Sequence, residues 1–281
     1  CILKGQGNAL LYPDPYMRTP GDIDIYLSGG RKKIMKYVDQ VCPNQVMRYH
    51  HVDFPVMKTA IEVHFTPSYM FFPVHNRRMQ KWFKKVMGEQ CNHRVSLPDG
   101  YGEIHVPQVS FNVIYILSHL YRHIFTEGIG LRQLLDYYFV LVKWHTDLTN
   151  LTDSNKSLPQ MTQINTDLDT LRHELKYLGL WKFAQAVMFV MKEVFGLSED
   201  RMIAPMDERE GSFLLDEIMR GGNFGQYDDR MGSKVGESKI HRYFRMNLRN
   251  LRFVKHYPTE ALSEPLFRTW FALWKKIHGI K

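Results

Sequence analysis

The spacing of apolar residues changes near residue 107, and this change limits the possible folds more than any other feature of the chain. Up to that point, short apolar runs alternate with Gly and Pro, a pattern typical of short strands and helices joined by turns. From residue 108 onward, apolar residues recur at helical spacing over long stretches. The sequence therefore predicts an α+β fold in which a small mixed-sheet unit, residues 1–107, precedes a mostly helical domain, residues 108–281.

The order of secondary-structure elements follows from the same spacings. In the first part we expect short helices over 9–12, 31–41 and 75–87, strands within 18–27, 45–52 and 56–65, and a hairpin over 91–107. In the second part, the periodicity predicts helices over 109–124, 129–145, 160–178, 181–196, 208–220, 237–253 and 264–278. A polar stretch, 146–157, and a Gly-rich stretch, 221–236, are expected to be loops.

Composition indicates a protein with a packed core. Of the 281 residues, 44% are apolar and 23% charged, and 37 basic against 29 acidic residues give a formal charge of +8. No apolar stretch approaches the roughly 18 residues that a membrane span needs, so no membrane segment is expected. Cys1, Cys42 and Cys91 form no C-x-x-C pair, which favours a reducing compartment over a disulfide framework. Because no signal-peptide pattern is present, we expect a cytoplasmic protein.

The clearest chemical signal is the acidic strand R-T-P-G-D-I-D-I-Y-L at residues 18–27. Because side chains alternate along a strand, Asp22 and Asp24 are expected on the same face, where repulsion makes both charges costly. A divalent cation relieves this cost, and Mg²⁺ prefers hard oxygen ligands together with water and substrate phosphates. The pattern indicates phosphoryl or nucleotidyl transfer, and a merely solvated acidic turn is the alternative.

Two neighbouring features favour the first interpretation. Gly5-Gln6-Gly7 follows a short strand and precedes a helix, so its backbone N–H groups are suited to cradle phosphates. Glu62 lies in an apolar strand, where an unpaired carboxylate would be costly to bury, and His64 shares its face. This order of segments supplies a phosphate cradle and three carboxylates on the metal side.

These segments resemble a known family. They are L-K-G at residues 3–5, G-D-I-D-I at 21–25 with Arg18 before it, and I-E-V-H-F at 61–65. They look like the uncharacterised nucleotidyltransferase family of the DNA polymerase β-like superfamily. The resemblance continues through H-x-x-x-H at 119–123 and L-R at 131–132 to Asp136, and covers roughly residues 2–140.

The resemblance implies a reaction and a site. An NTP, with ATP as the first candidate, would donate a nucleoside monophosphate to an acceptor and release pyrophosphate; a small molecule, a protein side chain or an RNA end would serve as acceptor. The implied catalytic residues, Asp22, Asp24 and Glu62, would hold two Mg²⁺ ions, with Mn²⁺ as an alternative. The implied phosphate-binding residues are Lys4, Gly5, Gln6, Gly7 and Arg18. The rival hypothesis is a noncatalytic relative that binds a partner protein or RNA in a toxin–antitoxin or regulatory role.

Five further residues leave alternatives open. His64 would either orient Glu62 or the acceptor, or serve a structural role. His119 and His123 lie four residues apart on one helix face, a spacing compatible with a metal or with histidines of a core or interface. Arg132 and Asp136 have the same spacing, so they would form an ion pair bracing the helix, or Arg132 would reach a phosphate across the cleft.

The stretch 243–253 interleaves basic and apolar residues and predicts an amphipathic helix. Its apolar residues Phe244, Leu248 and Leu251, with Val254, are expected to face inward and to leave a solvated basic face; nucleic-acid binding is the alternative. No nucleophile elbow, Walker A loop, Rossmann glycine triplet or H-E-x-x-H occurs in the sequence, so those enzyme classes are disfavoured.

Overall fold

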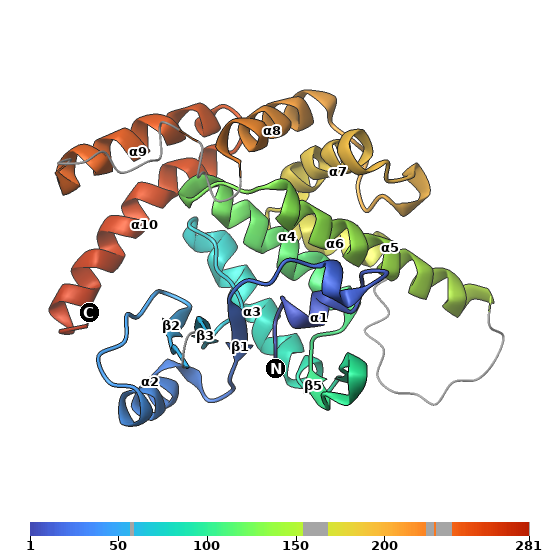
Figure 1. Ribbon diagram of the computed structural model, residues 1–281. Coiled ribbons are helices and arrows are strands. Elements are labelled where there is room, and N and C mark those ends of the chain that lie inside the picture. Colours follow the sequence, from blue (N-terminus) through green and yellow to red (C-terminus); the bar gives the residue numbers. More distant parts are fainter. Residues whose placement is uncertain (57–58, 154–167, 223–227, 229–237, 281) are drawn as a thin grey trace.

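The computed structural model describes residues 1–56, 59–153, 168–222, 228 and 238–280. The first part contains strands β1 (Ile23–Tyr26), β2 (His51–Asp53), β3 (Ile61–His64), β4 (Arg94–Ser96) and β5 (Glu103–His105), with helices α1 (Gln6–Ala9), α2 (Gly30–Val41) and α3 (Pro73–Gln90). The second part contains α4 (Val109–Thr126), α5 (Leu131–Asp153), α6 (Leu168–Tyr177), α7 (Trp181–Phe195), α8 (Glu208–Gly221), α9 (Lys239–Val254) and α10 (Pro258–Ile277). The predicted α+β fold is confirmed, with the small mixed sheet near the N-terminus and the long helices after it (Figure 1).

The central sheet is mixed and has the strand order β1-β3-β2. β3 runs parallel to β1 and antiparallel to β2, and the register places Asp24 opposite Glu62 and His51 opposite His64. Val52 and Val63 pack against Ile34 and Val38 of α2. Because side chains alternate along a strand, the polar residues on either side of these valines project from the opposite face of the sheet, away from α2.

The large core is built around α4. Every residue from Phe111 to Phe125 is buried, so this helix is enclosed on all sides by the helices of the second part and by α3. The core also contains Leu3 from the N-terminal segment and Phe253 from α9. The histidines and arginine of α4 are therefore held on a rigid, fully packed element.

α10 returns to the sheet from the far end of the chain (Figure 1). Glu260, 1% exposed, accepts hydrogen bonds from the backbone N–H groups of Phe71 at 2.7 Å and Phe72 at 3.1 Å. Near the other end of the helix, Nζ of Lys275 donates to the carbonyl oxygen of Met47 at 3.1 Å. These contacts hold α10 in place beside the loop that leads into β2.

Most predicted elements are confirmed, and the differences have local causes. The predicted helix at 9–12 is wrong for residues 10–12, because α1 spans Gln6–Ala9 and a turn follows it. The helical spacing of Ile34, Tyr37, Val38 and Val41 predicts one buried stripe on α2, but Tyr37 and Val41 are exposed. The expected loop at 146–157 is wrong for residues 146–153, because α5 continues to Asp153. The hydroxyls of Thr146 and Thr149 donate to carbonyls four residues earlier, which satisfies these polar side chains within the helix. The rest of that loop, residues 160–167 of the predicted sixth helix and most of 221–236 lie outside the described residues.

The predicted orientation of α9 is wrong. Phe244, Leu248 and Leu251 are 60%, 68% and 58% exposed. The buried face instead carries Arg249 and Asn250, which donate to the carbonyl oxygens of residues 124 and 125 at 3.0 and 2.9 Å. The last carbonyls of a helix need donors from outside it, so the end of α4 draws these two polar residues inward. Val254 packs against the core as expected.

None of the helices within the described ranges combines the length and the hydropathy needed to cross a lipid bilayer.

Candidate functional site

The sheet face opposite α2 carries a compact group of carboxylates and imidazoles. Asp24 of β1 is 1% exposed, and its Oδ1 lies 2.9 Å from Nε2 of His64 and 3.2 Å from Nζ of Lys4. Oε2 of Glu62 lies 3.4 Å from the same His64 nitrogen and 3.0 Å from Nδ1 of His51. The second carboxylate oxygen of Asp24, Oδ2, is buried and has no hydrogen-bond partner among the described residues.

The electrostatics of this group follow from its contacts. Burial alone would raise the pKa of Asp24, but Lys4 and His64 together hold it well below its usual range. Burial would likewise lower the pKa of His64, but the hydrogen bonds and charges of Asp24 and Glu62 outweigh it and raise this pKa. The carboxylate of Asp24 is therefore ionised in the folded protein, with Lys4 and His64 as its compensating groups.

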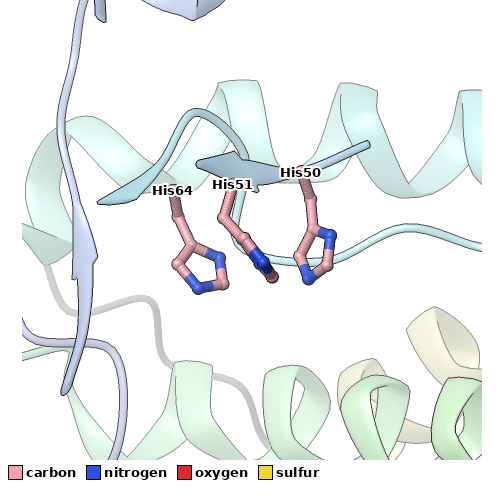
Figure 2. A group of neighbouring side chains, drawn as sticks. All are labelled: His50, His51 and His64. Carbon is pink, nitrogen blue, oxygen red and sulfur yellow. The ribbon is translucent and has the colours of Figure 1, made fainter. Parts of the chain in front are cut away.

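Two more histidines lie beside this group. The ring centroids of His50, His51 and His64 are 4.4 to 5.1 Å apart, and Figure 2 shows the three rings projecting from the strands to the same side. Burial lowers the pKa of His51 to about 2, helped by His64 and Arg122, and it lowers the pKa of His50 well below its ordinary value. His50 and His51 are therefore neutral imidazoles at physiological pH.

A pocket of about 1350 Å³ opens in front of the sheet face. The strands and the loop before β2 form one wall, α4 forms another and α10 a third. Its cationic lining residues are Lys4, Arg48, Arg122, Arg132, Arg268, Lys275 and Lys276, and its acidic ones are Asp22, Asp53, Glu62, Glu127 and Glu264. Asp24 and His64 lie outside the lining and contact it through Lys4 and Glu62. Such a mixture of charges suits a polyanionic ligand that approaches a carboxylate-bound cation.

The structure brings together only some of the residues predicted from the sequence. Asp24, Glu62 and His64 each offer a ligand atom within 4.8 Å of the others. Asp22 lies just before β1, exposed at the pocket rim, and belongs to none of the compact ligand groups within the described residues. Lys4 contacts Asp24 and also lies with its Nζ 3.1 Å from Nε2 of His119.

The predicted glycine cradle lies outside the pocket lining. Gly5 has φ of +67°, which favours glycine, and a Cβ on Gly7 would lie 2.8 Å from Cγ1 of Val106. The turn is therefore compact because Val106 packs closely against Gly7. Within it, Oε1 of Gln6 is buried without a hydrogen-bond partner among the described residues. The phosphate-binding role of Gly5, Gln6 and Gly7 stays a prediction.

Arg18 forms an ion pair with a residue of α5. Its Nε and terminal nitrogen donate to the two carboxylate oxygens of Asp136 at 2.9 and 2.8 Å, and Tyr12 donates to Oδ1 at 2.6 Å. Asp136 therefore pairs with Arg18, and the predicted bracing pair between Arg132 and Asp136 is replaced by this longer-range one. Arg132 instead lines the pocket, with a terminal nitrogen 3.9 Å from where a Cβ on Gly21 would lie. The alternative that Arg132 reaches a phosphate stays a prediction.

The prediction from the sequence missed some histidines of the pocket and gave others too little weight. His50 and His51 were missed. The alternation of His51 with Asp53, at the end of the predicted strand 45–52, is the same signal that identified Glu62 and His64, whereas no such signal marks His50. His119 and His123 are buried with ring centroids 4.3 Å apart, and both line the pocket. Burial, with Arg122, lowers the pKa of His123 to about 4.

The carboxylate-bearing mixed sheet, the helical part above it and the cationic pocket fit the class of nucleotidyltransferases that the motifs resemble. The sequence model of the family described as uncharacterised nucleotidyltransferase matches residues 1–196, and the chain belongs to this family. Comparisons with curated proteins and with solved structures give no significant match.

Proposed function

We propose that the protein is a metal-dependent nucleotidyltransferase that moves a nucleoside monophosphate from an NTP, ATP in the first instance, to an acceptor and releases pyrophosphate. The observation that carries this proposal is the buried Asp24, whose Oδ2 has no partner among the described residues, beside Glu62 at the edge of a cationic pocket. Leaving a carboxylate oxygen buried and unpaired costs free energy, so a site that retains one is expected to use it.

The donor set fits a divalent cation. Asp24 and Glu62 offer hard oxygen atoms close together, and Asp22 at the pocket rim offers a third. We propose Asp22, Asp24 and Glu62 as the residues that hold two Mg²⁺ ions, with Mn²⁺ as the alternative. Bound ions of this kind neutralise phosphate charge and lower the pKa of an acceptor hydroxyl.

Lys4 connects the carboxylates to the nucleotide in this proposal. Its Nζ covers Asp24 at 3.2 Å, and Lys4 also lines the pocket. A triphosphate entering the pocket attracts this ammonium group, so Lys4 would turn from Asp24 toward the phosphates and expose the carboxylate. Arg132 and Arg122, which also line the pocket, would bind the remaining phosphate charge.

His64 would serve as a positioning residue. Its Nε2 contacts Asp24 at 2.9 Å and lies 3.4 Å from Glu62, so one ring fixes the relative orientation of both carboxylates. The size of the pocket supports two substrates, because about 1350 Å³ exceeds the roughly 300–1,000 Å³ of a typical small-molecule site. The NTP would occupy the part near Lys4, which leaves space toward α10 for the acceptor.

The test measures pyrophosphate release and transfer of label from each α-labelled NTP in the presence of Mg²⁺, with candidate acceptors of the three classes. Asp24→Asn should lower the rate by about 100-fold or more, in the range typical for loss of one electrostatic group. Asp39→Asn, an exposed aspartate on α2, is the matched control and should leave the rate unchanged. A rate that Asp24→Asn leaves intact would overturn the metal-site assignment. NTP binding without release of pyrophosphate under every condition would instead favour the noncatalytic, partner-binding alternative.

A further inference from the structure

We propose that His50, His51 and His64 form a second metal site, which takes a divalent transition-metal ion of the zinc type. This inference goes beyond nucleotidyl transfer, since it assigns an ion to the imidazoles of His50 and His51, which the proposed transfer reaction does not use. Each of the three residues offers one ring nitrogen within 4.8 Å of the other two. All three side chains are buried. His50 immediately precedes β2, and His51 of β2 lies directly opposite His64 of β3 in the register.

The arrangement of the rings suits one ion. Figure 2 shows the rings of His50, His51 and His64 side by side on one face of the strands. Zinc–nitrogen bonds of about 2.0–2.1 Å in tetrahedral geometry place the nitrogens about 3.3 Å apart. The ring nitrogens, already within 4.8 Å, would therefore have to close by at most about 1.5 Å, a change that small χ rotations supply.

Ring nitrogens available to such an ion are present. Nδ1 of His50 and Nδ1 of His64 are buried without a hydrogen-bond partner among the described residues. Nε2 of His64 faces Asp24 at 2.9 Å, which leaves Nδ1 as the nitrogen free to bind. Since a buried polar atom without a partner is costly, two such atoms in one group indicate a ligand that satisfies them.

Carboxylates lie beside two of these histidines, as they commonly do beside histidines that bind a metal. A ligating imidazole usually gives its other nitrogen to a carboxylate, which fixes the ring orientation. His64 has Asp24 in this position, and His51 has Glu62 at 3.0 Å from Nδ1. His119 and His123, although buried in the same pocket, belong to no compact group of three potential ligands within the described residues.

The type of donor atom determines which metal ion the site would prefer. Three imidazole nitrogens favour Zn²⁺, Co²⁺ or Ni²⁺ over Mg²⁺, which prefers oxygen. Three protein ligands also leave a fourth position open, as in zinc sites that bind water or substrate. His50 and His51 line the pocket, so this fourth position would face the pocket volume.

The experiment uses the full chain, freed of metal by chelation, and titrates it with Co²⁺ while recording the visible absorption spectrum. We expect intense bands typical of four-coordinate Co²⁺, saturating at one ion per chain and displaced by Zn²⁺ but not by a large excess of Mg²⁺. His50→Gln and His51→Gln should each weaken binding at least tenfold. His119→Gln is the matched control, a buried pocket histidine outside the three, and should bind Co²⁺ as the unmodified protein does.

X-ray absorption at the zinc edge of the unmodified protein gives a readout that needs no variant, because imidazole ligands have a distinct scattering pattern. Three imidazoles around the ion support the site. Ligation by oxygen alone, displacement of Co²⁺ by Mg²⁺, or unchanged affinity in a correctly folded His50→Gln protein would overturn it. Failure of pyrophosphate release in the transfer assay would leave these spectra unaffected, so the two proposals fail independently.

Discussion

Replacing Asp136 with Asn tests whether Arg18 stabilises the fold rather than binding the nucleotide. The side chains of Arg18 and Asp136 are only 12% and 11% exposed, and two parallel hydrogen bonds join them. Asn keeps the shape and the oxygen that accepts from Tyr12, but it leaves the guanidinium without a counter-charge. Removing one partner of a buried ion pair lowers the free energy of unfolding by about 3–5 kcal/mol. Because this pair keeps some exposure, we expect a loss near the lower limit, about 3 kcal/mol.

Urea unfolding followed by far-UV circular dichroism measures this change, and a loss of about 3 kcal/mol corresponds to a fall in Tm of roughly 6–12 °C. The double variant Arg18→Met/Asp136→Leu removes both charges, so it should be less destabilised than the sum of its two single variants. The reasoning is refuted if Asp136→Asn costs less than about 1 kcal/mol. It is also refuted if Arg18→Met raises the KM for NTP while leaving the unfolding free energy unchanged.

Three further substitutions have predictable effects on stability. Burial raises the pKa of Glu264 above its ordinary 4.5, so the folded state binds its proton more tightly and stability falls as pH rises through the raised value. Glu264→Gln should therefore stabilise the protein near neutral pH, and the difference should disappear as the pH falls below 4.5; equal denaturation midpoints at neutral pH would contradict this. Gly211→Ala should destabilise by about 1–3 kcal/mol, because its Cβ would lie 2.3 Å from Cβ of Phe189 across the α7–α8 contact. Gly88→Ala in α3 meets nothing within 4 Å and should stabilise by about 0.5–1 kcal/mol, so calorimetry showing the same sign for both glycines would count against the packing argument.

The sequence predicts those features of the fold that depend on local periodicity. Helical spacing finds α4, α7 and α8 nearly to the residue, and the alternation of a strand places Glu62 and His64 on the same face. These predictions succeed because neighbours along the chain decide which side of an element a residue occupies.

Contacts between distant segments have no such local signal. The apolar residues of α9 predict an inward face, yet the unsatisfied carbonyls at the end of α4 select Arg249 and Asn250 instead. Asp136 has Arg132 at ion-pair spacing on its own helix, but it pairs with Arg18, 118 residues away in sequence. Both outcomes depend on hydrogen-bonding needs of a partner element that periodicity does not reveal.

The family match ends at residue 196, whereas the pocket wall formed by α10 lies beyond it. The sheet, α4 and the carboxylates lie inside the matched region, and Arg268, Lys275 and Lys276 lie outside it. A change in α10 can therefore reshape one wall of the pocket without altering the matched part of the chain.

The position of α10 in the sequence also sets the order in which the pocket is completed during synthesis. The carboxylates and histidines of the sheet leave the ribosome early, whereas Lys275 and Lys276 of α10 follow some 210 residues after Glu62. Until then, the sheet face lacks the wall of the pocket that α10 forms. A nascent chain that has not yet been synthesised as far as Lys276 therefore lacks one wall of the pocket, which is completed only when α10 docks.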